Sequence, residues 1–202
     1  MNIWLILWVF VSVFIMGIFF WSIQILSRQK QAWKLFAKRH DLSYDRGSVM
    51  STATVAGDMN GYGLAVFSEA QLEADGRSKK FRTIIQFELP SGMPTEGVVA
   101  TAGLREMASL LDLSETFEPQ NGQWSGAIYL RTKNVEKFKS YLTKERVDTL
   151  HSLMSQSDMN AIFIFNEEET LLRVETPNPL DTAEKLERVI NELMSKVKLL
   201  SL

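Results

Sequence analysis

The stretch IWLILWVFVSVFIMGIFFWSIQIL, residues 3–26, decides how this chain is organised. It contains no charged side chain, and the first charge after it is Arg28. As a helix it would be roughly 36 Å long, because an α-helix rises about 1.5 Å per residue. The hydrocarbon core of a bilayer is about 30 Å thick. The stretch therefore predicts a transmembrane helix.

Two other interpretations of residues 3–26 fit less well. A buried core helix is not expected, because the stretch is apolar on every face and is too long for the interior of a domain of this size. A cleaved signal peptide has a basic n-region, an apolar core of about 7–15 residues and small residues at the cleavage site. Here only Met1 and Asn2 precede a longer core, and bulky Ile25 and Leu26 follow Ser22–Gln24. We therefore expect an uncleaved anchor.

Aromatic and basic side chains flank the apolar stretch, as they do at membrane–water interfaces. The predicted membrane-interface residues are Trp4, Trp8, Trp21, Arg28, Lys30, Lys34, Lys38 and Arg39. The stretch itself has no ionisable residue, so an ion pathway within it has no support. It also lacks the small-xxx-small spacing that lets two membrane helices approach closely. We expect the helix to act as a plain anchor.

The charge around the anchor predicts its orientation. Six basic residues lie in 27–46 against Asp41 and Asp45, a local balance of +4, whereas the preceding side offers only the α-amino group. Basic residues close to a span remain cytoplasmic. We expect a single-pass protein of the plasma membrane with its N-terminus outside and residues 27–202 in the cytoplasm. The absence of cysteine agrees with that side, although an exported domain without disulfides would look the same.

The basic segment, residues 27–46, is predicted to be a juxtamembrane helix, with helical spacing over 27–42. One interpretation is a surface helix drawn to anionic lipids, worth about 1 kcal/mol per nearby Lys or Arg. The other is the ordinary positive flank of a span, with Trp33 and Phe36 packed on the soluble domain. We favour the second, because most single-span anchors carry such a flank. His40 is expected to be a solvated residue at the helix end.

Residues 47–202 are expected to form one soluble domain. They carry 16 of the 22 Lys and Arg residues and 22 of the 24 Asp and Glu residues, a balance of −6. Nucleic acid is therefore not an expected partner, because phosphate binding needs a basic surface. About 156 residues are sufficient to bury a core of their own.

Alternating polar and apolar residues predict the strands of this domain. The strongest case has Phe81, Thr83, Ile85, Phe87 and Leu89 on one face. Two turns are predicted, a hairpin at Asn60-Gly61 and a second turn at Asp75-Gly76. A stretch that is apolar on both faces, 161–165, is expected to be a central strand. The other predicted strands are 49–55, 62–66, 98–101, 124–130 and 171–175.

Helical periodicity predicts a helix at 104–111, one or two amphipathic helices over 135–154 with a break near Thr143, and a final amphipathic helix over 183–197. Asp181 and Glu184 have the spacing of a capping box. The expected fold class is α+β: one N-terminal transmembrane helix, then a mainly antiparallel sheet domain with amphipathic helices covering one face.

The order of these features resembles a group of uncharacterised bacterial single-span membrane proteins that carry a domain of unknown function. The features are the apolar span, Trp33-x-x-Phe36-Ala37 with Leu42-x-Tyr44, the glycine hairpin, a late apolar hairpin and the final amphipathic helix. The resemblance is one of layout. It implies a bacterial inner-membrane location and transfers no functional residue.

Few residues suggest chemistry. Without cysteine, thiol catalysis and thiolate metal sites are excluded. His40 and His151 lie in different predicted helices, and the glycine-rich segment 57–63 lacks the ending and the following helix of a phosphate loop. Asp112, Glu115 and Glu118 are close in sequence without indicating a shared site, and the run Glu167–Glu169 is expected to be a solvated turn. We predict no catalytic, cofactor-binding or metal-binding residue.

Three functions remain open. The first is a membrane-anchored, non-enzymatic interaction or accessory domain, supported by the predicted anchor and by the absence of predicted catalytic residues. The second is a small-molecule or lipid-binding domain tethered to the membrane, and the third a carboxylate-based hydrolase. The expected partners are the bilayer through residues 3–26, anionic lipid at the basic flank, and a membrane protein.

Overall fold

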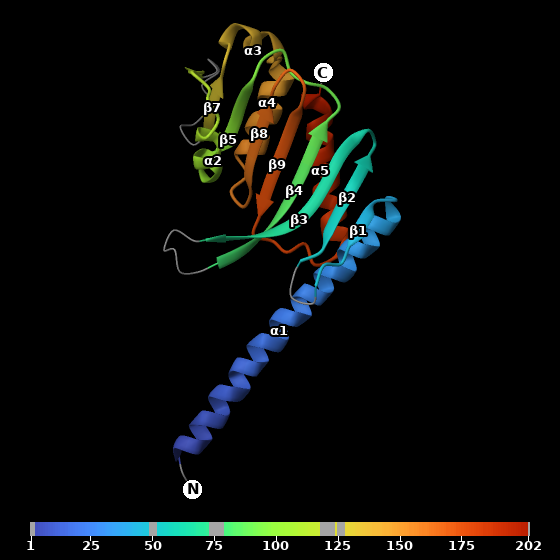
Figure 1. Ribbon diagram of the computed structural model, residues 1–202, viewed down its shortest axis with the longest axis vertical. Coiled ribbons are helices and arrows are strands. Elements are labelled where there is room, and N and C mark those ends of the chain that lie inside the picture. The colour runs from blue at the N-terminus through green and yellow to red at the C-terminus, as the bar shows by residue number, and fades with distance from the viewer. Residues whose placement is uncertain (1–2, 49–51, 73–78, 118–123, 125–127, 202) are drawn as a thin grey trace.

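A long helix projects from one end of an α+β domain (Figure 1). The computed structural model describes residues 3–48, 52–72, 79–117, 124 and 128–201. The helices are α1 (Ile3–Arg39), α2 (Arg105–Ser109), α3 (Val135–Tyr141), α4 (Lys144–Met154) and α5 (Ala183–Leu200), with a 3-10 turn, η1 (Ala102–Leu104). The strands are β1 (Ser43–Asp45), β2 (Thr54–Met59), β3 (Tyr62–Leu72), β4 (Lys79–Leu89), β5 (Gly97–Thr101), β6 (Glu115–Thr116), β7 (Ile128–Thr132), β8 (Asn160–Phe165) and β9 (Thr170–Thr176).

Helix α1 joins the apolar stretch and the basic segment without a break. Among the described residues it is the one helix long and apolar enough to cross a membrane. It ends at Arg39, where Asp41 adopts φ 55° and the backbone N–H of Leu42 donates to the carbonyl of Ala37. This is the αL termination that satisfies the last helical carbonyls. The helix therefore stops short of residue 42, and residues 43–45 pair with β2 instead.

The strands form one nine-stranded sheet in the order β1-β2-β3-β4-β9-β8-β5-β7-β6, with every pair antiparallel. The prediction of an antiparallel α+β fold is confirmed, and 161–165 is an interior strand, as expected. The predicted hairpin joins β2 and β3. Its turn has Asn60 at φ 58° and Gly61 at φ 83°, the left-handed pair that matches the twist of a two-residue hairpin.

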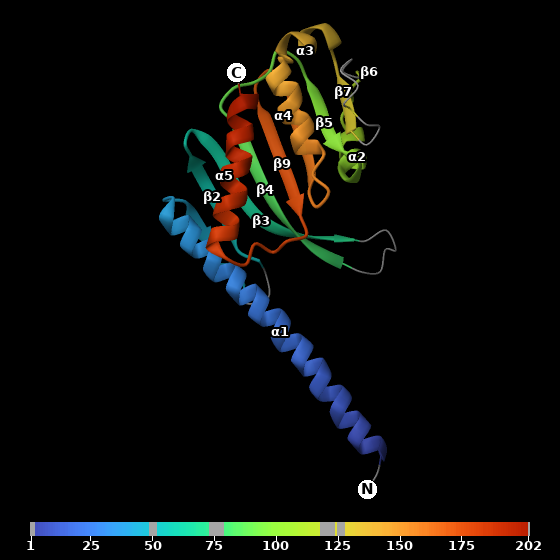
Figure 2. The same ribbon diagram turned by 180° about the vertical axis from the view of Figure 1, so that it is seen from behind.

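Most helices lie on one face of the sheet (Figure 2). The C-terminal part of α1, together with α3, α4 and α5, encloses the main core, whose largest fully buried side chains are Trp33, Phe36, Phe87, Phe138, Phe163 and Phe165. On the other face, Leu104 and Ala108 of η1 and α2 cover a smaller cluster with Val98 and Ile162. The remaining part of that face carries charged side chains such as Arg173 and Glu175 beside apolar ones such as Phe67 and Ile84.

Three local predictions need correction. Phe81 was expected on the buried face of its strand, but 63% of its surface is exposed, because β3 and β4 extend as an arm beyond the covering helices (Figure 1). The N-cap of α5 is Thr182 rather than Asp181: the Thr182 hydroxyl accepts from Lys185 N, and Asp181 instead pairs with the Lys185 ammonium group at 2.8 Å. The strand predicted at 124–130 is β7, Ile128–Thr132. The turn at Asp75-Gly76 lies outside the described residues.

Candidate functional site: a groove between the N-terminal helix and the sheet

The last turns of α1 are part of the core of the domain. Trp33 and Phe36 have no exposed surface. The Trp33 indole N–H donates to the carbonyl of Leu180 at 3.2 Å, and the Gln29 amide donates to the carbonyl of Pro179 at 2.8 Å. The helix that leaves the apolar stretch is therefore fastened directly to the loop preceding α5, with no linker between them.

That loop is held in an unusual backbone conformation. Leu180 has φ 49°, a left-handed conformation that is sterically unfavourable for leucine. Its N–H donates to the Asn178 side-chain oxygen at 3.0 Å, which closes an Asx turn. This turn directs the Leu180 carbonyl to the Trp33 indole. The backbone conformation of the loop therefore positions its hydrogen bond with α1.

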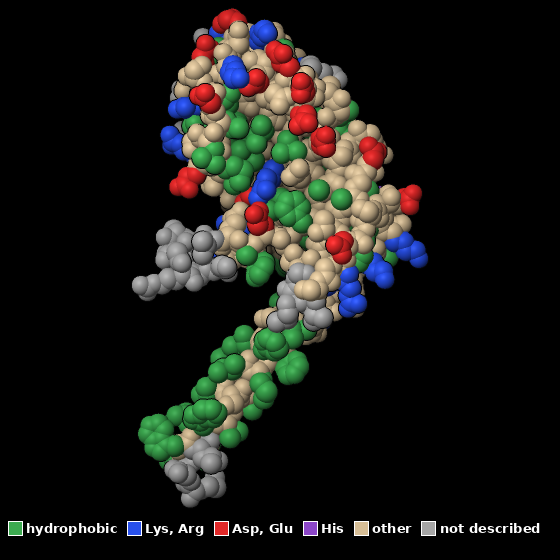
Figure 3. Space-filling view, viewed as in Figure 1, with side chains coloured by type: hydrophobic (Ala, Val, Ile, Leu, Met, Phe, Trp, Pro, Cys, Tyr) green, Lys and Arg blue, Asp and Glu red, His purple; other side chains and the backbone are tan. Residues whose placement is uncertain are grey.

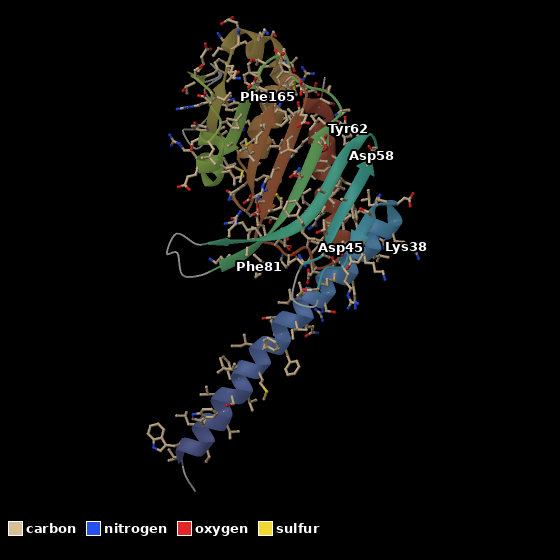
Figure 4. All side chains as sticks on the ribbon, in the orientation of Figure 1. Lys38, Asp45, Asp58, Tyr62, Phe81 and Phe165 are labelled. Carbon is tan, nitrogen blue, oxygen red and sulfur yellow. The ribbon has the colours of Figure 1, made fainter. Side chains whose placement is uncertain are left out.

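A groove of about 490 Å³ lies at this junction, between α1 and the arm of β3 and β4. Its apolar walls are Phe19, Ile23 and Leu26 of α1, Phe81 of β4, and Pro177 and Pro179 of the loop before α5. Phe81 lies near the base of the arm, on the side of the domain from which the helix projects (Figure 4). The groove thus has one wall from the apolar stretch and one from the sheet.

The groove also has polar lining residues. Gln29, Thr52, Ser68, Arg82 and Thr83 line it. The Thr52 hydroxyl donates to the Ser68 carbonyl at 3.2 Å, and the Thr83 hydroxyl donates to the Asn178 carbonyl at 2.8 Å. Both hydroxyl hydrogens are therefore already donated to backbone carbonyls of the protein. The Arg82 guanidinium forms no ion pair or side-chain hydrogen bond with any part of the chain that the structure describes.

The predicted membrane-interface residues fall into two groups. Trp4, Trp8 and Trp21 are exposed on the part of α1 that projects from the domain, which Figure 3 shows covered with hydrophobic side chains. Of the basic residues, Arg28, Lys34 and Lys38 are also exposed. Lys30 and Arg39 differ, because the Lys30 ammonium group donates to the Ser48 carbonyl and Arg39 pairs with Glu187 at 3.0 Å. Part of the basic flank therefore holds the domain together.

The structure does not bring the other candidates together. Asp112 lies in a separate surface hollow, whereas the Glu115 carboxylate accepts from the backbone N–H of Val135 at the start of α3. His40 packs against Phe36, and His151 lies within hydrogen-bonding distance of Ser155. Over residues 3–48, 52–72, 79–117, 124 and 128–201, no three His, Cys, Asp or Glu side chains are grouped to hold a metal ion. Glu118 lies outside the described residues.

Sequence analysis missed a buried ion pair on the sheet face that faces away from α5. Glu175 has no exposed surface, and its carboxylate accepts from Arg173 Nε at 2.9 Å and from the Gln71 amide at 2.6 Å. Arg173 also contacts Glu69 at 2.7 Å. Opposite charges two residues apart on one strand lie on the same face, and that spacing could have revealed the pair. Every Glu175 oxygen is already occupied, so we regard the cluster as structural.

Comparison with known proteins adds little. No protein-family model matches the chain, and no curated protein matches it. Among solved structures, the crystal structure of the mycobacterial trehalose monomycolate transport factor A, TtfA, is similar over 85% of this chain and 95% of that chain, with 15% sequence identity and a TM-score of 0.49. A likeness this distant assigns no residue and no activity.

Proposed function

We propose that this protein is a membrane-anchored accessory domain that presents a rigid surface, at a fixed height above the bilayer, to another protein of the same membrane. One observation carries the proposal: α1 continues without interruption from the apolar stretch into the buried Trp33 and Phe36. A domain that needed to move freely would be joined by a flexible linker. A continuous helix instead fixes its orientation.

The same observation supports an uncleaved anchor. Signal peptidase requires small residues after the apolar core. Here the residues at that position, Ser22 to Leu26, are helical and lead within two turns to the buried Gln29 and Trp33. Cleavage would cut a helix whose next turns pack in the domain core. The expected product is the full-length chain, which the mass of the membrane-extracted protein would verify.

The cytoplasmic orientation can be tested with single cysteines, because the natural sequence has none. Asn2→Cys and Lys198→Cys variants would be treated with a membrane-impermeant maleimide in intact and in permeabilised cells. We expect Asn2→Cys to be labelled in intact cells and Lys198→Cys only after permeabilisation. Labelling of Lys198→Cys from outside would overturn the orientation.

The accessory role predicts a protein neighbour in the membrane. A photo-crosslinking amino acid would replace Leu110, the C-cap residue of α2, which is 85% exposed. In a separate variant it would replace Leu199 of α5, which lies on the opposite face of the sheet. We expect one of the two positions to give a discrete crosslink to an integral membrane protein. Insertion of a flexible Gly-Ser segment between Ser27 and Arg28 should weaken that crosslink, because it releases the domain from the span. Absence of a crosslink at both positions would contradict the role.

The groove favours lipid binding as a second function. That function requires no protein partner, so the two are separable: crosslinking to a protein tests one, and retention of lipid by the purified chain tests the other.

A further inference from the structure

A second hollow, of about 450 Å³, lies beside α1 at the end of the predicted span. One wall is a stripe of α1 with Ile23, Ser27, Lys30 and Lys34, which recur at spacings of three and four residues. The other wall comes from Tyr44 and Arg46, in and just after β1. We call it the basic hollow, to distinguish it from the groove between α1 and the arm. Residues that are well separated along the chain thus meet at one level of the helix.

The reversal of the chain after α1 brings Arg46 to the hollow. The strand β1 runs back along the helix, and Figure 4 shows its Asp45 beside α1. The Tyr44 hydroxyl donates to the Lys30 carbonyl at 3.1 Å, and the Lys30 ammonium group donates to the Ser48 carbonyl at 2.6 Å. Both contacts are made to the same residue of α1. They therefore hold the segment on either side of Arg46 at the level of Lys30.

The basic hollow collects positive charge without an acidic partner. Lys30, Lys34 and Arg46 line it, and no carboxylate belongs to its described lining. Asp45 is adjacent in sequence, but its carboxylate accepts from the backbone N–H of Gly47 at 2.9 Å. Lys34 and Arg46 are exposed, and neither forms an ion pair or a side-chain hydrogen bond within the ranges that the structure describes. Their charges are therefore available to an anion.

Other basic residues of the segment 27–46 are placed differently. Arg28 lines a separate hollow together with the acidic residues Asp181 and Glu184. Lys38 is exposed on α1 but lines neither this hollow nor that one. The structure thus distinguishes cations that share a hollow without carboxylates from cations that carry the same charge elsewhere on the segment.

The basic hollow begins at the level where a bilayer becomes polar. Its residues Ile23 and Leu26 belong to the predicted span, whereas Lys34 lies eight residues beyond Leu26, or about 12 Å along the helix axis. The polar headgroup region is about 5–7 Å thick on each side of a bilayer. Because the Cα–Cβ bonds of a helix tilt towards its N-terminus, the Lys34 side chain reaches back towards that region. The hollow is therefore apolar where it meets hydrocarbon and basic where it meets headgroups.

We propose that the basic hollow binds the headgroup of one anionic phospholipid of the adjacent leaflet, with its phosphate between Lys34 and Arg46. The acyl chains stay in the bilayer, against Ile23 and Leu26. The proposal rests on the membrane anchor of the proposed function and not on the protein partner. A phosphate and a glycerol together have about ten non-hydrogen atoms and fill about 300 Å³ if each takes the roughly 30 Å³ of a water molecule. The 450 Å³ of the hollow accommodates such a headgroup, and no acyl chain has to enter it.

The lining of the hollow suits a lipid phosphate better than an acidic protein segment. The Arg46 guanidinium can donate two parallel hydrogen bonds to phosphate oxygens, and Lys34 adds a compact positive charge. Ser27 and Gln31 of the same wall offer a hydroxyl and an amide to the rest of the headgroup. An acidic peptide would satisfy the cations but would bring its polar backbone against Ile23. A phospholipid carries the anion and the hydrocarbon in the order in which the hollow presents their partners.

Native mass spectrometry of the full-length protein in mild detergent tests the proposal. Phosphatidylglycerol and phosphatidylcholine with identical dioleoyl chains would be added in separate titrations. We expect one equivalent of phosphatidylglycerol to bind, on the order of tenfold more tightly than phosphatidylcholine. The double variant Lys34→Gln with Arg46→Gln should lose that preference. The matched control, Arg28→Gln with Lys38→Gln, removes the same charge from the same segment and should keep it.

Two outcomes of these titrations would overturn the proposal. One is equal binding of the two lipids by the unmodified protein. The other is an equal loss of preference in both double variants, because only the net charge of the basic segment would then matter. All four substituted side chains are exposed, so the variants are expected to fold, and thermal unfolding of each one checks this.

Two further measurements identify the source of the phosphate. Inorganic phosphate in large excess should leave phosphatidylglycerol bound, because only the lipid also contacts Ile23 and Leu26. A photo-crosslinking amino acid in place of Gln31, which is exposed in the hollow, should attach to lipid. Displacement of the lipid by inorganic phosphate, or a crosslink from position 31 to a protein instead of a lipid, would overturn the proposal. None of these outcomes changes the expected protein crosslinks from Leu110 or Leu199, so failure of this site is distinguishable from failure of the accessory role.

Discussion

Trp33 and Leu180 are joined by a hydrogen bond of 3.2 Å from the indole N–H to the carbonyl oxygen, although 147 residues separate them. Trp33 is fully buried and Leu180 is 2% exposed. This bond connects the C-terminal part of α1 to the loop before α5. It places the groove walls, because Pro177 and Pro179 belong to the same loop.

Trp33→Phe should destabilise the domain by about 1–3 kcal/mol, because the Leu180 carbonyl would be left buried without a donor. Denaturant unfolding of the full-length protein in detergent measures the change. Trp21→Phe serves as the matched control, since Trp21 is 68% exposed on the projecting part of α1 and should have no effect on the domain. Equal stability of the two variants would show that the bond contributes nothing.

Arg173→Ala should cost about 3–5 kcal/mol of unfolding free energy, because Glu175 would keep a buried charge without its counter-ion. Glu175 has no exposed surface, and its Oε1 lies 2.8 Å from Arg173 Nη2. A double variant, Arg173→Met with Glu175→Leu, should recover most of the loss, since two apolar side chains avoid burying a charge. If the double variant were as unstable as the single one, packing rather than charge would be the cause.

Gly61→Ala should destabilise the β2–β3 hairpin by about 1–2 kcal/mol through backbone strain alone, because an L-residue disfavours the left-handed region. Gly61 has φ 83°, and a Cβ there would meet nothing within 4 Å. Gly17→Ala has the same empty surroundings without a positive φ and is expected to be neutral. Chemical denaturation of both variants separates strain from steric overlap.

Acid should weaken two i,i+4 ion pairs along α5. The hydrogen bond from Lys185 lowers the pKa of Asp181, and the hydrogen bond from Lys196 lowers the pKa of Glu192. Since both carboxyl pKa values are lower in the folded state, their stabilisation is present above the ordinary values of 3.8 and 4.5 and is lost as the pH falls through the folded-state values.

Each of these pairs contributes about 0.3–0.5 kcal/mol after solvent screening. The variant Asp181→Asn with Glu192→Gln should therefore be slightly less stable at pH 7 and lose less stability on acidification. Thermal unfolding from pH 7 to about pH 3 measures both effects. An unchanged slope against pH would contradict the role of these two carboxylates.

Features with a local cause were predictable from the sequence. The apolar stretch is long enough to span a bilayer, Asn60-Gly61 forms its turn because both residues accept a positive φ, and the 3.6-residue stripe of α5 is buried as expected. The errors also have identifiable causes. Alternation placed Phe81 on the buried face, but it could not show that β4 extends beyond the helices that cover that face.

The sequence by itself determined the long apolar N-terminal helix, the class of fold and the position of most strands and helices, because each depends on side chains that are neighbours along the chain. Only the tertiary structure decided that Trp33 meets Leu180, that Glu175 is buried with Arg173, and that Phe19, Phe81 and Arg82 line one groove. These contacts join α1, β4 and the segment leading into α5. Such non-local contacts depend on strand order and on the packing of the whole sheet, which local periodicity does not encode.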